Sequence, residues 1–318
     1  MLTIPNAGRN AGKGALAALA IVCLTAAAAP PPPADPEATV ADEFVVKGRL
    51  PGPAWWKVSR GDSKVFLMGM PGALPKGMAW DTSVLERRLK GANELIGRPQ
   101  VRAGLGDLFG ILKLRTSQPM EAQLSPNLRA RLTAAETRLG KKSDAYSHWT
   151  PVVAGLQLVG DYRKSASLDS AEPGATIERL ARREGIRVEP AGAYNAGALL
   201  KTITPELSAL GEVCLTDALD EVDAGPAQIR AAAEGWARGD SRAALSASRG
   251  YEKCVNAMPE GADLARRAMN DTAATIERAL AKPGHAVAIV NLRTLLASDG
   301  VLQQLRARGY TVTTPEEE

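Results

Sequence analysis

The sequence predicts an α/β fold, with a mixed β-sheet core built from two strand-loop-helix-strand units at the chain ends and a large helical insertion between them. Two observations predict the sheet: residues 64–97 read as strand, loop, helix and strand, and residues 286–313 read the same way. A third observation predicts the insertion, because the residues between the two units are rich in alanine and leucine. The units form a pseudo-repeat, whose loops we expect to meet at one site.

A β-hairpin opens the first unit. Residues 55–59 and 64–69 are short runs of β-forming residues. Between them, Arg60-Gly61-Asp62-Ser63 contains the Gly and Asp that suit a tight turn. We therefore assign the Arg-Gly-Asp tripeptide to the turn and not to cell adhesion.

Each unit then continues into a helix and a strand. In the first unit, Asp81 can cap a helix that Gly91 ends, and residues 94–96 form the next strand. The second unit consists of a strand at 286–290, a helix at 299–308 that Gly309 ends, and a strand at 310–313.

The insertion is predicted to be mostly helical. Its Ala- and Leu-rich segments lie near residues 125–138, 151–160, 174–184, 204–218, 224–238, 241–257 and 261–281. Pro151, Pro205 and Pro226 stand near helix starts, where the missing N–H does no harm. Residues 187–189 form one additional strand.

The N-terminal residues read as an export signal. Arg9 and Lys13 precede a short apolar run that ends in four alanines, so we expect a signal peptide over 1–29, a Pro-rich tether over 30–52 and a folded domain over 53–318. An uncleaved N-terminal anchor is the alternative. Either form places the protein outside the cytoplasm, in the periplasm or secreted, with no membrane span in the mature chain if the signal is cleaved.

The charge balance argues against a nucleic-acid partner. The formal net charge is +4, and removal of Arg9 and Lys13 with the signal leaves +2, because residues 1–29 contain no Asp or Glu. A dedicated nucleic-acid binder needs a clustered basic face, which this balance does not predict.

Two cysteines would remain in the mature chain. Cys214 and Cys254 lie far from any histidine in the sequence, and in an oxidising compartment such a pair indicates a disulfide. Two buried free thiols are the alternative, since free cysteine packs as a small hydrophobic residue. In neither case does the spacing indicate a reactive thiol.

Signatures of catalysis and cofactor binding are scarce. The chain has two histidines, His148 and His285, and neither stands in a recognised metal-ligand spacing. A carboxylate-only site for a harder metal stays open, although no acidic cluster marks one. The sequence also lacks a phosphate-binding loop, a dinucleotide-binding glycine motif and a nucleophile elbow, so we expect no cofactor.

Two segments carry a family resemblance. Trp55 to Gly97 contains the loop Gly69-Met70-Pro71-Gly72-Ala73-Leu74-Pro75-Lys76-Gly77, and Ala288 to Gly300 reads AIVNLRTLLASDG. The first resembles the Gly-Thr-Ile-His-x-Leu-Pro-x-Gly loop and the second the Gly-x-x-His-Leu-Pro-Gly-x-Asp-Gly motif of the TraB/PrgY/GumN family. The resemblance extends over roughly residues 54–313. It implies the fold of a metal-dependent hydrolase or peptidase family.

The positions of the family's functional side chains hold residues that cannot bind metal. Gly72 and Thr294 stand where the two motifs carry histidine, and Gly97 stands where the family carries glutamate. Thr176 and Gly192 likewise replace acidic residues in the middle of the chain. Glycine and threonine do not supply the imidazole or carboxylate that a divalent metal requires. The resemblance therefore implies a divergent member without the family's metal site.

A crevice between the two loops is the candidate site. Gly69 belongs to a glycine-bearing loop that could present backbone N–H groups to an anion, although turn formation alone also explains its glycines. Lys76, Asn291 and Arg293 would border the crevice if the units meet, which would suit a carboxylated or phosphorylated ligand.

These inferences predict an exported, catalytically inactive homologue with a binding or scaffolding role in the cell envelope, whose partner is an envelope protein or a small ligand. One alternative is an active metal-dependent hydrolase or peptidase with substitute ligands. Another, implied only by the family, is a structural component of a polysaccharide-export or envelope system.

Overall fold

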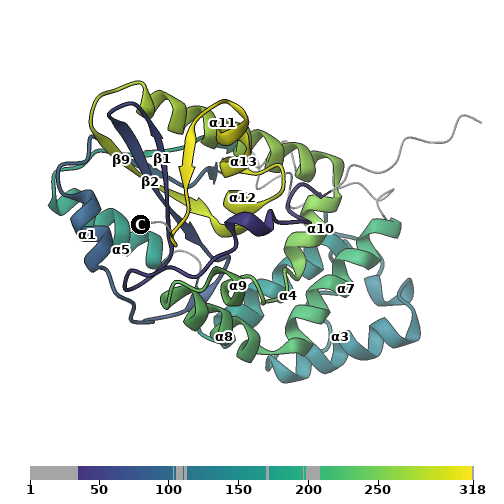
Figure 1. Ribbon diagram of the computed structural model, residues 1–318. Helices are drawn as coiled ribbons and strands as arrows, with labels where there is room; N and C mark the ends of the chain where they lie inside the picture. Colours follow the sequence, from purple (N-terminus) through teal and green to yellow (C-terminus); the bar gives the residue numbers. More distant parts are fainter. Residues whose placement is uncertain are drawn as a thin grey trace, which may run out of the picture. The chain divides into compact units, whose positions relative to one another are not determined.

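The structure, a computed structural model, describes residues 35–102, 104, 110, 113–169, 172–195, 197 and 208–316. Its main sheet has six strands in the order β10-β1-β2-β9-β4-β7. The strands are β1 Trp55–Arg60, β2 Ser63–Met70, β4 Leu95–Gly97, β7 Val188–Pro190, β9 His285–Asn291 and β10 Thr311–Thr313. β1 pairs antiparallel with β2 and β10, whereas β2, β9, β4 and β7 run parallel. The predicted α/β class is confirmed (Figure 1).

Strands from the two ends of the chain form the middle of this sheet. β2 pairs with β9 over its length, from Lys64↔His285 to Met70↔Asn291, and β4 pairs with the other edge of β9. The five central residues of β9 are all buried. A continuous buried run is typical of a parallel strand that is covered on both faces.

Helices cover both faces of the sheet. They are α1 Ser83–Leu89, α5 Glu172–Arg183, α11 Pro259–Leu280, α12 Leu292–Leu296 and α13 Val301–Ala307. α11 packs against β2 and β9, and α1 contacts β9 and α5. Figure 1 shows the strands between α1 and α5 on one side and α11 and α13 on the other.

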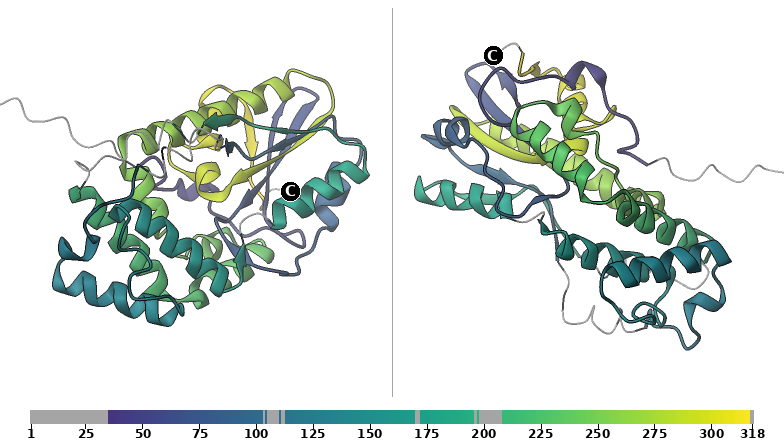
Figure 2. Two further views of the ribbon diagram at one scale, coloured as in Figure 1. Left: turned by 180° about the vertical axis from the view of Figure 1, so that it is seen from behind. Right: turned by 90° about the horizontal axis from the view of Figure 1, so that it is seen from below.

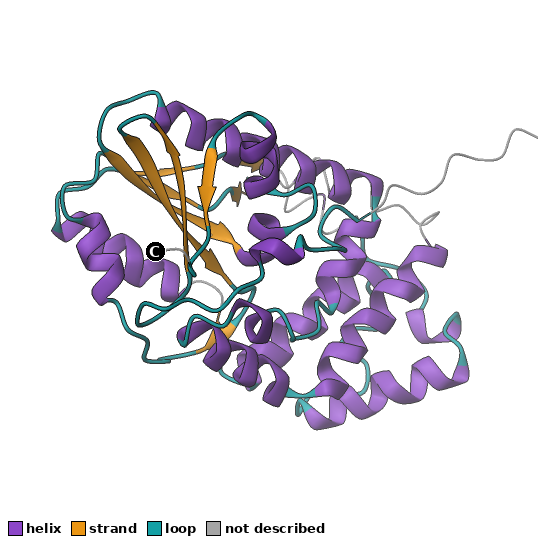
Figure 3. Cartoon of the chain, in the orientation of Figure 1, coloured by secondary structure: helices purple, strands orange, loops and turns teal. Residues whose placement is uncertain are grey.

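The helical insertion has a hydrophobic core of its own. Its main helices are α3 Pro126–Arg138, α4 Pro151–Ser165, α7 Ser208–Ala224 and α10 Tyr251–Ala257. Buried residues of these helices, among them Leu132, Leu158 and Leu219, form a cluster separate from the core of the sheet. Figures 2 and 3 show these helices gathered beside the sheet. None of the described helices combines the length and apolar composition that a membrane span requires.

A disulfide joins α7 to α10 within this core. Cys214 and Cys254 are both fully buried, with their Cα atoms 4.8 Å apart. The bond fixes the short helix α10, which has only two turns of its own, against the longer α7.

Residues 241–257, predicted as one helix, instead form α9 Ser241–Ala244 and α10, and this prediction is wrong. The chain leaves the helix between them because Gly250 has φ +48°, a conformation that side-chain-bearing residues rarely adopt. A Cβ atom at Gly250 would also lie 2.1 Å from Oε2 of Glu221.

The remaining elements are helix α8 Pro226–Ala237, the 3₁₀ turns η1 Asp42–Phe44 and η2 Met120–Ala122, and two short strand pairs. In these pairs, β3 Leu74–Pro75 is joined to β6 Leu168–Asp169, and β5 Gln100–Arg102 is joined to β8 Ala193–Asn195.

The segment before β1 packs against the domain along its described part. Val40 bridges to Ala297 and Lys47 to Asp240, and the side chain of Phe44 is completely buried. Residues 35–52 therefore differ from the extended tether that the proline run predicted. The predicted signal peptide, residues 1–29, lies outside the described residues.

Candidate functional site

The loops of the two end units meet, as the pseudo-repeat predicted. β2 and β9 run parallel and stop side by side at Met70 and Asn291, so the residues that follow both strands lie at one edge of the sheet. Pro71, Gly72 and Ala73 from the first loop and Asn291 to Arg293 from the second line one solvent-open cavity of about 60 Å³. This edge is where α/β sheets commonly bind ligands.

The helical insertion supplies the rest of the cavity wall. α4 contributes Arg163, α7 contributes Glu221, and the segment from α9 to α10 contributes Arg249 and Glu252. The cavity is thus lined by three arginines, counting Arg293, and two glutamates. It lies between the sheet and the insertion, so both parts of the fold position it.

Glu252 occupies the space beside Gly72, the position at which the first motif of the resembled family carries histidine. A Cβ atom built at Gly72 would lie 2.6 Å from Oε1 of Glu252. Such a contact is too short for two non-bonded atoms, so a larger residue at position 72 and Glu252 in its present place exclude each other. A carboxylate from the insertion therefore stands where the resemblance placed a histidine.

Thr294 is likewise in contact with a carboxylate. Its Oγ1 donates a hydrogen bond to Oε1 of Glu37, which belongs to the segment before β1. Asn291 caps α12: its Oδ1 accepts from the backbone N–H groups of Arg293 and Thr294, at 2.9 and 3.3 Å. Thr294, which stands at the position of the second motif's histidine, is therefore held in a polar network that contains no histidine.

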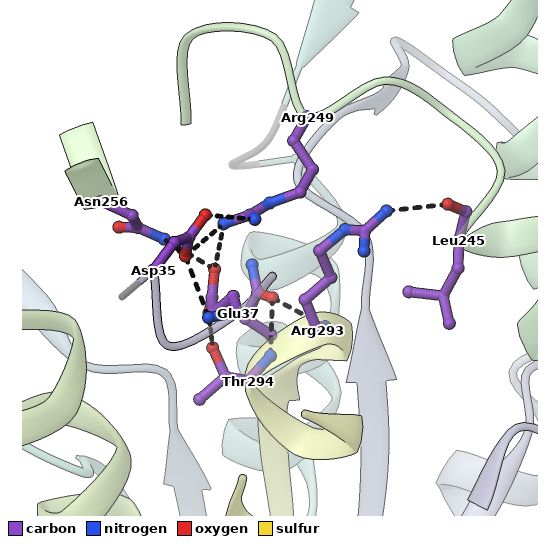
Figure 4. A network of polar contacts seen from close by, with 8 residues as sticks. Asp35, Glu37, Leu245, Arg249, Asn256, Arg293 and Thr294 are labelled. Atoms are coloured by element: carbon purple, nitrogen blue, oxygen red, sulfur yellow. Dashed lines mark hydrogen bonds and ion pairs between the residues drawn. The ribbon is translucent and has the colours of Figure 1, made fainter. Parts of the chain in front are cut away.

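Arg249 is at the centre of this network (Figure 4). Its Nη1 and Nη2 atoms donate to the two carboxylate oxygens of Asp35, at 2.5 and 3.0 Å, and Nη2 lies 3.5 Å from Glu37. Asn256 also donates to both carboxylates. Burial tends to raise the pKa of Asp35, but the hydrogen bonds from Arg249 and from the Glu37 backbone lower it in the net.

The other two arginines of the cavity have different partners. Nε of Arg163 donates to Oε1 of Glu221 at 2.8 Å, and the Glu221 side chain is only 3% exposed. Arg293 donates from Nη2 to the carbonyl oxygen of Leu245 at 2.9 Å. Burial lowers the pKa of Arg293, and repulsion from Arg249 acts in the same direction.

Two polar groups of the cavity have no hydrogen-bond partner among the described residues. One is Nε of Arg249, whose side chain is 8% exposed. The other is the carboxylate of Glu252, which no hydrogen bond or ion pair joins to the described part of the chain. Burial raises the pKa of Glu252, and repulsion from Glu37 and Glu221 adds to this against the attraction of Arg163 and Arg249. A perturbed carboxyl in a cavity is typical of a functional group.

Four of the seven sequence-predicted positions do not line the cavity. Gly97 is the last residue of β4 and lines a separate hollow with Arg98 and Ile289. Gly69 is packed under Leu292, whose Cδ1 would lie 2.4 Å from a Cβ at position 69, and its carbonyl accepts from Nε1 of Trp236. Lys76 is exposed next to β3. Of the predicted set, Gly72, Asn291 and Arg293 line the cavity, and Thr294 lies beside it.

The histidines do not reach this site. His148 contacts the carbonyl oxygen of Thr116 in the insertion, and His285 contacts that of Arg88 at the opposite end of β9. Over the residues that the structure describes, no group of three or more His, Cys, Asp or Glu side chains is arranged to hold a metal ion.

The sequence alone did not identify Arg163, Glu221, Arg249 or Glu252 as site residues. They come from three helical segments that are far apart in the chain, and only the packing of the insertion brings them together. One local signal was present: Gly250, next to Arg249, lies inside a run that otherwise predicts a helix, and an isolated glycine weakens such a prediction.

A family model described as TraB/PrgY/gumN matches residues 54–314. The comparisons found no match among curated proteins and none among solved structures.

Proposed function

The chain belongs to the TraB/PrgY/gumN family, and from that premise we propose that it is an exported, catalytically inactive member that binds a small polar ligand in the cavity between its two end motifs. The position of Glu252 carries the proposal. Its carboxylate fills the space beside Gly72, so the cavity presents a different polar side chain where the resemblance placed histidine.

The charges of the cavity support binding of an organic ligand over binding of a divalent cation. Three guanidinium groups face the same small space and repel a divalent cation, whereas only Glu252 among the lining carboxylates is free of an ion pair. A catalytic zinc site needs three protein ligands and an open position for water. Gly72 and Thr294 supply neither imidazole nor carboxylate.

A second candidate is an active metal-dependent hydrolase with substitute ligands. One observation favours it: Glu252 lies against Gly72 and Glu37 lies against Thr294, so a carboxylate stands next to each former histidine position. Glu37 is already held by Thr294 and Asn256, and Glu252 faces arginines, which makes the pair a poor cation site.

Metal titration separates the two candidates. We expect the purified protein to hold less than one equivalent of zinc, manganese or cobalt, and its melting temperature to stay constant when these metals are added, because a ligand that binds the folded state alone must raise that temperature. Metal content by mass spectrometry and melting curves with and without chelator provide the measurement. A chelator-sensitive rise in melting temperature would contradict the proposal.

Export is supported by two observations. The first 29 residues have the charge and apolar pattern of a signal peptide. The Cys214–Cys254 disulfide is typical of proteins in an oxidising compartment. On this basis we place the protein in the periplasm or outside the cell.

A further inference from the structure

The two unpaired groups of the cavity have complementary chemistry. Nε of Arg249 is a buried donor without a partner, and the Glu252 carboxylate is an acceptor without one, in each case among the described residues. Arg293 adds a positive charge, and its Nη2 donates to the carbonyl oxygen of Leu245. No ion pair joins Arg293 to Glu252 within the described structure, although each acts electrostatically on the other across the cavity.

The packing of the site keeps these charges apart. The Nη atoms of Arg249 are already bound to Asp35, which leaves its Nε edge for another acceptor. Arg163 is bound by Glu221, so it cannot turn to Glu252 without leaving a buried carboxylate unpaired. A buried donor and a half-buried acceptor that do not satisfy each other indicate a ligand that satisfies both.

Resting on the proposed binding function, we infer that the cavity binds a small carboxylic acid with a hydrogen-bond donor on the adjacent carbon, that is, an α-amino or α-hydroxy acid. The carboxylate contacts Arg293 and Nε of Arg249. The ammonium or hydroxyl group donates to Glu252. Arginine suits carboxylates, and the charged acceptor selects for a donor group.

The size of the cavity fits a ligand of this class. A volume of about 60 Å³ accommodates roughly four to six water-sized groups. A three-carbon acid with one substituent has six non-hydrogen atoms on the same scale. The opening to solvent leaves room for a longer side chain to project outward.

Isothermal titration calorimetry of the intact protein with four matched compounds tests the inference. These are propionate, lactate, alanine and lactamide. We expect lactate and alanine to bind at least about tenfold more tightly than propionate, the ratio that one hydrogen bond to a charged group supports. Lactamide, which lacks the carboxylate, should not bind.

Variants assign the two ends of the ligand. Glu252→Gln should reduce alanine affinity about tenfold and should not weaken propionate binding, because propionate has no donor for Glu252 and the substitution removes a like charge. Arg293→Gln should weaken the binding of propionate, lactate and alanine. If Arg293→Gln does not fold, Arg293→Lys, which retains the positive charge, replaces it in the test. Arg238→Gln is the matched control, because Arg238 is 64% exposed and does not line the cavity.

Several results would overturn the ligand class. They are equal affinity for propionate and alanine, binding of lactamide, tighter binding of inorganic phosphate than of any acid, or no binding of any acid. In each of these cases, the proposed function would still hold if the protein also takes up no metal. Metal uptake would overturn the proposed function itself.

Discussion

Among the described residues, Glu252 is the carboxylate of the cavity wall that no ion pair neutralises. Its side chain lies beside Gly72 and within the field of two arginines, yet forms no hydrogen bond with a described residue. Substitution of histidine for Gly72 would require the Glu252 carboxylate to move, because a Cβ atom at position 72 would lie too close to Oε1 of Glu252.

The raised pKa of Glu252 predicts a pH-dependent stability. Burial raises this pKa above its ordinary value of 4.5, so the folded state holds a proton that the unfolded state has released. The group's contribution to stability is therefore complete below pH 4.5 and is lost as the pH rises through the raised pKa. Glu252→Gln stays neutral, and its free energy of unfolding should increasingly exceed that of the wild type as the pH rises.

Urea denaturation of both proteins between about pH 4 and pH 7 measures this difference. The comparison cancels the titration of other carboxyl groups, including Asp35, whose lowered pKa acts in the opposite direction. Two parallel stability curves would show that Glu252 titrates alike in the folded and unfolded states.

At the scale of elements, α10 is the critical piece of the insertion. It is a seven-residue helix that follows Gly250 and carries Glu252, Cys254 and Asn256. A helix this short is not stable alone, so its position depends on Tyr251, which donates to the carbonyl oxygen of Val152, and on the disulfide.

Removal of the disulfide should therefore affect both stability and binding. Cys214 and Cys254 are 40 residues apart, and the chain-entropy model gives a loss of about 4 kcal/mol when such a loop is opened. Cys214→Ala with Cys254→Ala should lower the free energy of unfolding by about this amount and weaken ligand binding through α10. Reductant should lower wild-type stability similarly and leave the double variant unchanged. Equal stability of the oxidised and reduced wild type would contradict the prediction.

The sequence predicted those elements whose signals are local. The hairpin, the helix that begins near Asp81 and the strand–helix–strand order of residues 286–313 all depend on nearby turn residues and apolar runs, and each is present. The break at Gly250 was missed because Ser, Ala and Arg before it are compatible with a helix. The positive φ of Gly250 ends the helix, and the close approach of Glu221 to this residue is a tertiary contact that sequence periodicity does not show.

For the whole molecule, the predicted convergence of the two end units proved the most informative inference from the sequence. It placed Gly72, Asn291 and Arg293 at one cavity through strands β2 and β9. It could not place Arg163 or Glu252, because the packing of the insertion against the sheet depends on many weak contacts. It also missed Asp35 and Glu37, which precede the residues matched by the family model.

The position of these two carboxylates near the N-terminus gives the proposed signal cleavage a consequence for the site. Signal cleavage near residue 29 would leave Asp35 and Glu37 on the mature chain, where they neutralise the buried Arg249 and bind Thr294 and Asn256. A cut beyond residue 37 would leave Arg249 charged, buried and unpaired. Loss of one partner from such a pair typically costs about 3 kcal/mol or more.

We therefore expect the mature N-terminus to lie before Asp35, and intact-mass measurement of protein recovered from the cell envelope should locate it near residue 30. A chain that begins at residue 30 should unfold with the same free energy as the full-length chain, whereas one that begins at residue 38 should be less stable by about 3 kcal/mol. Asp35→Asn in the longer chain is the matched control for the charge, and should cause part of the same loss. A full-length chain in the cytoplasm would contradict export, and equal stability of the two truncated chains would show that Arg249 does not depend on these carboxylates.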